Sequence, residues 1–508
     1  MTASSTMASA ATIDQKMALL STDEAQIPVW RHFFAFTDVP RPSGHEERVV
    51  QMLKDFADQR GLVWKQDAIG NIVIKRPGSG GGESAPSVVI QNHVDMVTEA
   101  NSDSTHDFMK DPIKLLRDGD WIHADGTTLG ADNGVGAATA LALLDMPKDA
   151  KLPPIEGLFT IDEERGLTGA FELDPSLIEG RMLLNLDTED WGVIFIGCAG
   201  GGDSKITLPV TRTALPSGAK CCEVAVTGLL GGHSGLNIHE GRGNAVQMLA
   251  EVLAAISRTD GNMRVASVDG GDKRNAIARE ARAVIAVEDP AAAAKVAEKC
   301  MKDFRLEYGT LEAGLSIAAT EVPAPDVPAL DVASTGKMLA LLRTLPHGVA
   351  KMSHSLPNLV ETSNNVAAVK EDAPGGSSLI VTCATRSSVG PALETLRGKI
   401  KAIAELCGAE CVQEDAYPGW QPNPNSTLLS LAKSQYQELL GREPGVEAIH
   451  AGLECGIIGE KIPGIEMISM GPSITGAHSP DERVCVPTVK PFWDVTLKLL
   501  EKLADVKA

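Results

Sequence analysis

The sequence predicts an α/β protein whose mostly parallel sheet is interrupted by an inserted α+β domain. Apolar strand patterns alternate with helical patterns up to about Asp203. From about Ser204 to about Asp415 the strands instead alternate apolar and polar residues, with amphipathic helices between them. The first pattern then returns. A chain of 508 residues is also too long for one hydrophobic core.

The first part of the chain contains most of the predicted parallel sheet. Residues 45–61 have helical periodicity and end on a glycine, as helices commonly do. An Ala- and Leu-rich segment, 130–146, predicts a second helix. Strands that alternate with helices favour parallel pairing, with helices on both faces of the sheet. The apolar runs that predict strands are 71–78, 87–97, 155–164, 180–190 and 191–197.

The inserted region, 204–415, is predicted to be a sheet with one face covered by helices. A Pro-rich segment, 321–332, is predicted to be a linker within it. The alternating strand patterns are 221–228 and 280–289, and the amphipathic helical patterns are 244–256 and 393–406.

The last part of the chain returns to the pattern of the first. A helix is predicted at 427–441 and a final helix from about Val489, with apolar strands at 446–452 and 465–471. We therefore expect residues 27–203 and 416–508 to form one domain. Residues 1–26 are rich in Ala, Ser and Thr, without a basic start or a long apolar run. They predict a disordered tail rather than a signal peptide or an anchor.

Charge and cysteine content exclude several classes of partner. The formal net charge of −21 opposes binding to nucleic acid and to anionic membranes. No segment approaches the roughly 20 apolar residues of a membrane helix. Nine scattered cysteines, an odd number without a CxxC pair, predict reduced thiols rather than a disulfide framework. We therefore expect a cytoplasmic protein.

Polar residues follow the predicted strands where each strand ends. In an open α/β sheet, ligands bind outside the carboxyl ends of the strands. These residues should therefore meet at one edge, although they are far apart in sequence. They are His93, Asp95, Glu163, Glu164 and Asp187 after strands, Asp132 at the start of a helix, and His478 after the strand at 465–471.

The composition of this group predicts a site for divalent metal ions. Two histidines with several carboxylates and no thiolate suit Zn²⁺ or a similar ion. Ca²⁺ and Mg²⁺ sites rarely use two imidazoles. The carboxylates exceed what one zinc ion requires, whereas two ions about 3.5–4 Å apart, bridged by one carboxylate, would use them.

Each residue also has a structural interpretation. A histidine at a strand end is commonly a hydrogen-bonded structural residue, and two adjacent glutamates are commonly solvated. Asp132 alone is equally compatible with a helix cap. The segment 130–136 lacks the lysine and the glycine spacing of a phosphate-binding loop, and 231–235 lacks the spacing of a nucleophile elbow. Seven such residues at strand ends together favour the metal site.

Six motifs resemble those of the di-zinc aminopeptidase, aminoacylase and carnosinase superfamily, and within it those of the aminoacyl-histidine dipeptidases (peptidase D). The resemblance runs from about Val29 to the final helix and implies a catalytic domain with an inserted lid domain. The motifs are NHVDMV (92–97), GTTLGADNGVG (126–136), DEERGLTGAF (162–171), NLDTED (185–190), GGHSG (231–235) and TGAHSPDE (475–482).

The resemblance implies a role for each residue of the predicted metal site. His93, Asp187 and a bridging Asp132 would hold one zinc ion. Asp132, Glu164 and His478 would hold the second. Asp95 would hydrogen-bond the far nitrogen of His93 and fix its tautomer. Glu163 would be the general base that deprotonates the attacking water and then protonates the leaving amine.

The resemblance also implies roles for three residues of the lid. His233 would stabilise the oxyanion, although without the resemblance a structural turn residue is the better interpretation of GGHSG. Asn275 and Arg386 resemble residues that hold the substrate. A planar guanidinium suits the C-terminal carboxylate of a dipeptide. Whether His233 acts in its own chain or in a partner's is open.

We therefore expect a dipeptidase with two divalent metal ions, Zn²⁺ or alternatively Mn²⁺ or Co²⁺, that hydrolyses unblocked dipeptides, including Xaa-His. A related aminoacylase or carboxypeptidase is the alternative enzyme, distinguished by an acylated amino end of the substrate. A catalytically silent binding protein is expected to lack Glu163 or a ligand, and this sequence has them all. The resemblance also implies a homodimer.

Overall fold

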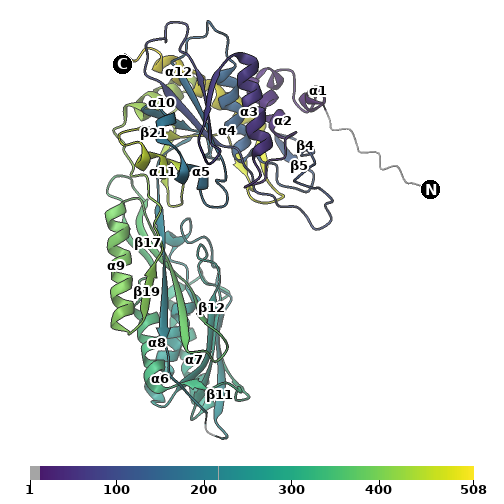
Figure 1. Cartoon of the computed structure of the whole chain (residues 1–508). Coiled ribbons are helices and arrows are strands. Elements are labelled where there is room, and N and C mark those ends of the chain that lie inside the picture. Colours follow the sequence, from purple (N-terminus) through teal and green to yellow (C-terminus); the bar gives the residue numbers. More distant parts are fainter. Residues whose placement is uncertain (1–11, 216, 508) are drawn as a thin grey trace, which may run out of the picture. The chain divides into compact units, whose positions relative to one another are not determined.

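The computed structural model describes residues 12–215 and 217–507, which form two compact units (Figure 1). The first unit extends to Gly197 and includes 422–448 and the chain from Leu453 onward. The second unit contains 198–421 and the short segment 449–452. The chain therefore passes between the units at four places. The predicted insertion, 204–415, lies within the longer segment of the second unit.

The first unit is built on an eight-stranded sheet of order β1-β2-β6-β3-β7-β21-β8-β20. Its four central strands, β6, β3, β7 and β21, are parallel, as predicted. Towards the edges, β1, β2 and β8 run antiparallel to their neighbours. The strands are β1 Val63–Gln66, β2 Ile72–Arg76, β3 Val88–His93, β6 Ile155–Thr160, β7 Met182–Asn185, β8 Val193–Cys198, β20 Gly445–Ile449 and β21 Glu466–Ser469.

Burial explains why the centre of this sheet is parallel. All six residues of β3 and all six of β6 are buried, as expected for strands covered on both faces. Helix α4 (Ala131–Leu144) packs against both strands and is itself almost entirely buried. Its Ala, Val, Leu and Gly residues are apolar on every side, which is typical of a buried helix.

The remaining helices of the first unit surround the sheet (Figure 1). Helix α3 begins at Glu47 and ends before Gly61, which takes the left-handed conformation at φ 65°, as predicted. The final helix begins at Val486 rather than Val489. Its first turn includes Pro487, and proline is tolerated at this position of a helix. This final helix is α12, Val486–Leu503. The others are α1 Ile13–Met17, α2 Pro28–Phe36, α5 Thr168–Glu172, α10 Thr427–Leu440 and α11 Glu454–Lys461, with 3-10 turns at Glu24–Gln26 and Pro175–Leu177.

A second, four-stranded sheet in the first unit was not predicted. Its order is β22-β23-β5-β4, and each strand is antiparallel to its neighbours. Two of its strands have only two and three residues, too few to show a pattern. This sheet places the loop that carries His478 between β22 and β23. The strands are β4 Leu115–Asp118, β5 Trp121–Ala124, β22 Ile474–Thr475 and β23 Arg483–Cys485.

The predicted disordered tail is wrong for residues 12–26, and residues 1–11 lie outside the described part of the chain. Thr12 caps α1 through a capping box with Gln15. Lys16 is buried, and its Nζ donates to Thr37 Oγ1 at 2.8 Å and to Asp38 Oδ1 at 2.7 Å. A salt bridge to a distant carboxylate orders this segment, and composition alone does not reveal such a contact.

The second unit is an antiparallel sheet with helices α6–α9 packed along it (Figure 1). The sheet order is β14-β11-β13-β12-β17-β18-β9-β19, and β16 also pairs with β17. Its strands are β9 Gly200–Pro209, β11 Lys220–Thr227, β12 Arg264–Gly271, β13 Ala281–Val287, β14 Ser316–Val322, β16 Gly348–Met352, β17 Val360–Glu371, β18 Ser378–Ser387 and β19 Glu410–Gln413. The remaining elements are the strand pair β10 Arg212–Thr213 and β15 Ala329–Leu330, a 3-10 turn at Ile238–Glu240, and helices α6 Ala245–Thr259, α7 Pro290–Tyr308, α8 Val332–Thr344 and α9 Gly390–Leu406.

The second unit has its own hydrophobic core. On β11, Cys222, Val224 and Val226 are buried against α6, while Glu223 and Ala225 between them are only partly covered. This alternation is the one the sequence predicted. Among the described helices of the whole chain, none is both long enough and apolar enough to cross a bilayer.

Gly136 allows α4 to approach the end of β7. A Cβ atom at this position would meet the carbonyl oxygen of Leu186. Gly136→Ala should therefore lower the free energy of unfolding by about 1–3 kcal/mol, the usual cost of overpacking. Gly398→Ala, in α9, is the control, because a Cβ there meets no atom within 4 Å. This second change should stabilise the protein by about 0.5–1 kcal/mol. Denaturant unfolding of both variants checks the opposite signs.

Candidate active site

The predicted residues of the first unit meet at the carboxyl edge of the central strands. His93 is the last residue of β3, and Asp187 follows β7 by two residues. Glu163 and Glu164 follow β6, and Asp132 lies in the first turn of α4. The loop between β22 and β23 brings His478 to the same place. All the predicted polar residues of this unit therefore lie together, as the strand-end pattern predicted.

Two groups of side chains share Asp132. His93 Nε2 lies 3.1 Å from Asp132 Oδ1 and 3.3 Å from Asp187 Oδ1. His478 Nε2 lies 3.2 Å from Asp132 Oδ2 and 3.0 Å from Glu164 Oε2. Each oxygen of Asp132 therefore belongs to a different group of one imidazole and one further carboxylate.

These separations suit a cation at the centre of each group. Ligands bound at about 2.0–2.1 Å in a tetrahedron lie about 3.3 Å apart. Asp187 Oδ1 and Glu164 Oε1 are buried without a hydrogen-bond partner. Asp187 Oδ1 lies 3.3 Å from His93 Nε2 without the geometry of a hydrogen bond. The donor set of nitrogen and oxygen atoms fits a borderline divalent ion.

The carboxylates also stabilise positive charge at both imidazoles. Hydrogen bonds to Asp132 and Glu164 raise the pKa of His478 to about 11. Burial alone would lower the pKa of His93, but the charge of Asp187 and hydrogen bonds to Asp132 and Asp95 raise it well above its usual value. The site therefore favours a cationic occupant in each group.

Asp95 lies behind His93, on the side away from Asp132. Its Oδ1 is 3.3 Å from His93 Nδ1. Its two oxygens accept the N–H groups of Glu163 at 3.1 Å and Glu164 at 3.2 Å. Burial would raise the pKa of Asp95, but its interaction with His93 and these N–H groups lower it to about 2. Asp95 is thus an anion that orients both the imidazole and the loop carrying Glu163.

Glu163 differs from its neighbours because its carboxylate forms no hydrogen bond to any described residue. Burial raises the pKa of Glu163 well above its usual value. The charge of His93 opposes this shift, while the charges of Asp187 and Glu164 reinforce it. A carboxylate with a raised pKa and no fixed partner is suited to accept and release a proton.

In the second unit, the backbone fixes the tautomer of His233. Its Nδ1 accepts the N–H groups of Gly235 at 3.2 Å and Leu236 at 3.0 Å. The neutral ring must therefore carry its proton on Nε2, which is left to donate. Burial, and then the charge of Arg386, lower the pKa of His233, which keeps the ring neutral.

The other two predicted lid residues lie in the same unit. The carbonyl oxygen of Asn275 accepts from Ser234 N at 2.8 Å, so Asn275 is next to His233. Arg386, on β18, donates from Nη1 to Tyr417 Oη at 3.2 Å. Its Nε is buried without a partner, and it pairs with no carboxylate among the described residues. Arg386 therefore has donors available for an anion.

Comparison with known proteins gives a family. Residues 89–502 match the model of Peptidase family M20/M25/M40. The cytosol non-specific dipeptidase of Escherichia coli (strain K12) is 38% identical over 479 residues, which cover 94% of this chain and 97% of that protein. The chain belongs to Peptidase family M20/M25/M40. The predicted resemblance is confirmed at this level.

Solved structures of other proteins support the M20 fold. Aminoacylhistidine dipeptidase from Vibrio alginolyticus superimposes with a TM-score of 0.87 at 39% identity, covering 94% of this chain and 96% of that one. A tripeptidase from Staphylococcus aureus matches with a TM-score of 0.54 at 16% identity, covering 94% and 98%. The similarity to the tripeptidase shows the fold alone.

Four buried residues of this M20 chain near the predicted sites were not singled out from the sequence. Burial raises the pKa of Glu454 to about 7, and its Oε2 accepts from Gln91 at 2.6 Å and Thr160 at 2.7 Å. Burial, Arg386 and His233 lower the pKa of His450 to about 3. Both lie in the segment IHAGLECG (449–456), outside the six motifs that carry the resemblance. The other two, Arg41 and Glu482, bind backbone groups, which no side-chain pattern reveals.

The geometry predicts different effects for the two adjacent glutamates. Glu164→Gln should weaken the binding of one metal ion, because Glu164 belongs to the group of His478. Glu163→Gln should leave both ions bound, because Glu163 belongs to neither group. Metal analysis of both variants after dialysis against a weak chelator checks this. If only Glu163→Gln lost an ion, Glu163 would be the metal ligand and Glu164 the candidate base.

Proposed function

We propose that this chain is a metal-dependent dipeptidase that hydrolyses unblocked dipeptides, including Xaa-His, with Glu163 as the general base. The observation that carries the proposal is the pair of imidazole–carboxylate groups that share Asp132, with the unpartnered Glu163 beside them. The activities named for the Escherichia coli and Vibrio alginolyticus relatives support the choice of dipeptides.

In this proposal two ions occupy the two groups. His93, Asp132 and Asp187 hold one, while Asp132, Glu164 and His478 hold the other. Imidazole and carboxylate ligands without thiolate favour Zn²⁺, with Mn²⁺ and Co²⁺ as alternatives. When bound, such ions polarise the peptide carbonyl and make a water molecule acidic enough to attack it.

The chain's own residues then position groups and move one proton. Asp95, whose Oδ1 lies 3.3 Å from His93 Nδ1, would accept a hydrogen bond from the Nδ1–H group and so present Nε2 as the ligand atom. Glu163 takes the proton of the attacking water and delivers it to the leaving amine. Its raised pKa supports this role, because the base must hold the proton until the C–N bond breaks.

His233 is proposed to donate its Nε2–H to the carbonyl oxygen as negative charge develops. The two backbone N–H groups on Nδ1 support this role, since they leave the proton on the other nitrogen. Arg386 is proposed to bind the C-terminal carboxylate of the dipeptide, and Asn275 to assist in holding the substrate. The unpartnered Nε of Arg386 supports recognition of an anion.

We further propose a cytoplasmic homodimer. The name of the Escherichia coli relative supports the location, as do nine scattered cysteines, an odd number without a CxxC pair. The dimer rests on the family resemblance.

The general base can be tested by kinetics. Glu163→Gln keeps the size of the side chain and removes its ability to accept the proton, so kcat should fall by at least about 10²-fold. Steady-state hydrolysis of a free dipeptide by fully metal-loaded protein measures the change. A kcat within a few-fold of wild type would rule out Glu163 as the base.

Three forms of one dipeptide test the substrate class. The free form should be hydrolysed, whereas the N-acetylated form should not. Arg386→Ala should raise KM for the free form more than for the C-terminally amidated form, because only the first carries a carboxylate. Arg282→Ala is the control, since this exposed arginine of the same unit already pairs with Glu223. Preferential hydrolysis of the acetylated form would favour an aminoacylase instead.

The role of His233 predicts a loss of rate without a loss of metal. His233→Ala should lower kcat by about 10²–10³-fold, the usual effect of removing one oxyanion donor. Metal content should not change. Mixing this variant with Glu163→Gln protein distinguishes the two arrangements, because recovered activity after verified subunit exchange means that His233 serves the partner's site. A wild-type kcat for His233→Ala would contradict the role.

A further inference from the structure

Glu482 binds four consecutive backbone N–H groups at the start of α4. Its Oε2 accepts from Leu129 N at 2.7 Å and Gly130 N at 2.9 Å. Its Oε1 accepts from Ala131 N at 2.7 Å and Asp132 N at 3.1 Å. Only 2% of Glu482 is exposed, so these bonds lie out of water. The fourth donor is the backbone of the residue whose side chain is shared by the two imidazole groups.

This arrangement requires a carboxylate. Two oxygens of an ionised carboxylate can accept four N–H groups, whereas an amide has one oxygen and an NH₂ group that would face two donors. Burial and the charge of Asp132 raise the pKa of Glu482 above its usual value, although hydrogen bonds from the N–H groups oppose this shift. Because the N–H groups occupy both oxygens, neither is left to carry a proton.

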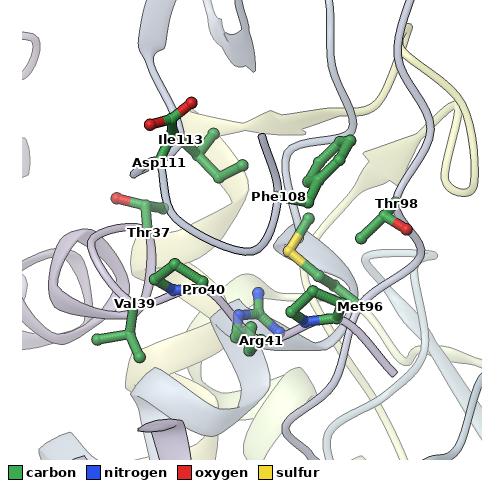
Figure 2. A pocket seen from close by; sticks show the side chains of 10 residues that line it. Thr37, Val39, Pro40, Arg41, Met96, Thr98, Phe108, Asp111 and Ile113 are labelled. Carbon is green, nitrogen blue, oxygen red and sulfur yellow. The ribbon is translucent and has the colours of Figure 1, made fainter. Parts of the chain in front are cut away.

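Arg41 joins the same turn to the end of β3. Its Nη1 donates to Val94 O at 2.9 Å and Asp95 O at 2.8 Å, and its Nη2 donates to Gly130 O. Figure 2 shows Arg41 and Met96 among the side chains that line a pocket. The volume of this pocket is about 10 Å³, which is room for one water molecule at most. Arg41 is 1% exposed; burial lowers the pKa of Arg41, and the charge of Glu482 opposes this shift.

Glu482 also belongs to the loop that carries His478. This loop runs between β22 and β23, and Glu482 N donates to Ser479 O at 3.0 Å within it. His478 has a φ of 61°, in the left-handed region that residues other than glycine seldom adopt. Such a conformation persists only where the surroundings hold it. The Glu482 side chain provides an anchor four residues away.

We infer that Glu482 is a positioning residue that holds Asp132 and His478 in register for the second metal ion. One side chain fixes the backbone of Asp132 and belongs to the loop of His478, so it sets the distance between these two ligands. The inference rests on the proposed function, in which Asp132, Glu164 and His478 bind that ion. Glu482 itself touches neither metal nor substrate in this scheme.

A matched control exists in the same unit. Glu156, on β6, is also 2% exposed, and its Oε2 accepts from Glu179 N at 3.0 Å and Gly180 N at 3.4 Å. It lies near the amino end of β6, whereas Glu163 and Glu164 follow the carboxyl end of that strand. Glu156→Gln therefore disturbs a buried carboxylate bound to backbone N–H groups without disturbing the site.

The experiment compares Glu482→Gln and Glu156→Gln with the wild type. Zn²⁺ stoichiometry and affinity are measured by chelator competition, together with Tm, kcat and KM. Glu482→Gln should lower the affinity for the second ion by about 10- to 100-fold, the usual effect of removing a group that orients ligands. It should also lower kcat, with little change in KM. Glu156→Gln should lower Tm without changing the Zn²⁺ affinity or kcat. Glu482→Asp keeps both oxygens and should recover part of the affinity.

Several outcomes would overturn the inference. Wild-type affinity for both ions in Glu482→Gln would do so, as would an equal loss in Glu156→Gln. If Glu482→Gln does not fold, Glu482→Asp carries the test: its shorter side chain should not reach all four N–H groups, so it should bind the second ion more weakly than the wild type does, and wild-type affinity there would overturn the inference. A wild type that binds no Zn²⁺ defeats the proposed function and the inference together. A wild type that binds two ions but hydrolyses no dipeptide defeats only the proposed activity, because the metal measurements still test Glu482.

Discussion

Repulsion between carboxylates at the edge of the parallel sheet is the constraint on which the rest of the site depends. Asp132 approaches both imidazoles, Asp187 approaches His93 and Glu164 approaches His478, all within 3.0–3.3 Å. Two like charges 4 Å apart cost about 4 kcal/mol at the effective dielectric typical of protein surfaces. Only a rigid support and opposite charges can hold them together. Buried strands β3, β6 and β7 give the support, and imidazoles, Arg41 and backbone N–H groups give the opposite charge.

The two units divide the polar chemistry between them. The first unit carries a cluster of carboxylates, and this cluster favours the binding of cations. In the second unit, burial and the charge of Arg386 lower the pKa of both His233 and His450, so both imidazoles are neutral at neutral pH. Arg386 thus lies near two neutral rings rather than near other cations. A hydrogen-bond donor and an anion-binding group are thereby available without a second cluster of carboxylates.

The sequence predicted the parts of the fold that depend on side-chain pattern. The apolar run before His93 identified a buried strand, and its abrupt polar end identified the edge where the site lies. The strands of two and three residues that hold the His478 loop are too short to form a pattern. Lys16 and Asp38, which order the segment predicted as a tail, are ordinary charges until the fold brings them together. Glu482 lies 350 positions from Asp132 and binds its backbone N–H, a group that every residue but proline carries.

The four passages of the chain between the units bear on how the protein could be taken apart. Ile449–Gly452 belongs to the second unit, although the segments on either side of it belong to the first. Ala199 N donates to Ile449 O and Ala451 O, and Ser363 Oγ lies 2.8 Å from His450 Nε2. Excising 198–421 would leave four residues without these partners. The second unit is therefore discontinuous in sequence, and recombination or cloning cannot move it as one continuous segment. A faithful transplant into another scaffold needs two separate grafts.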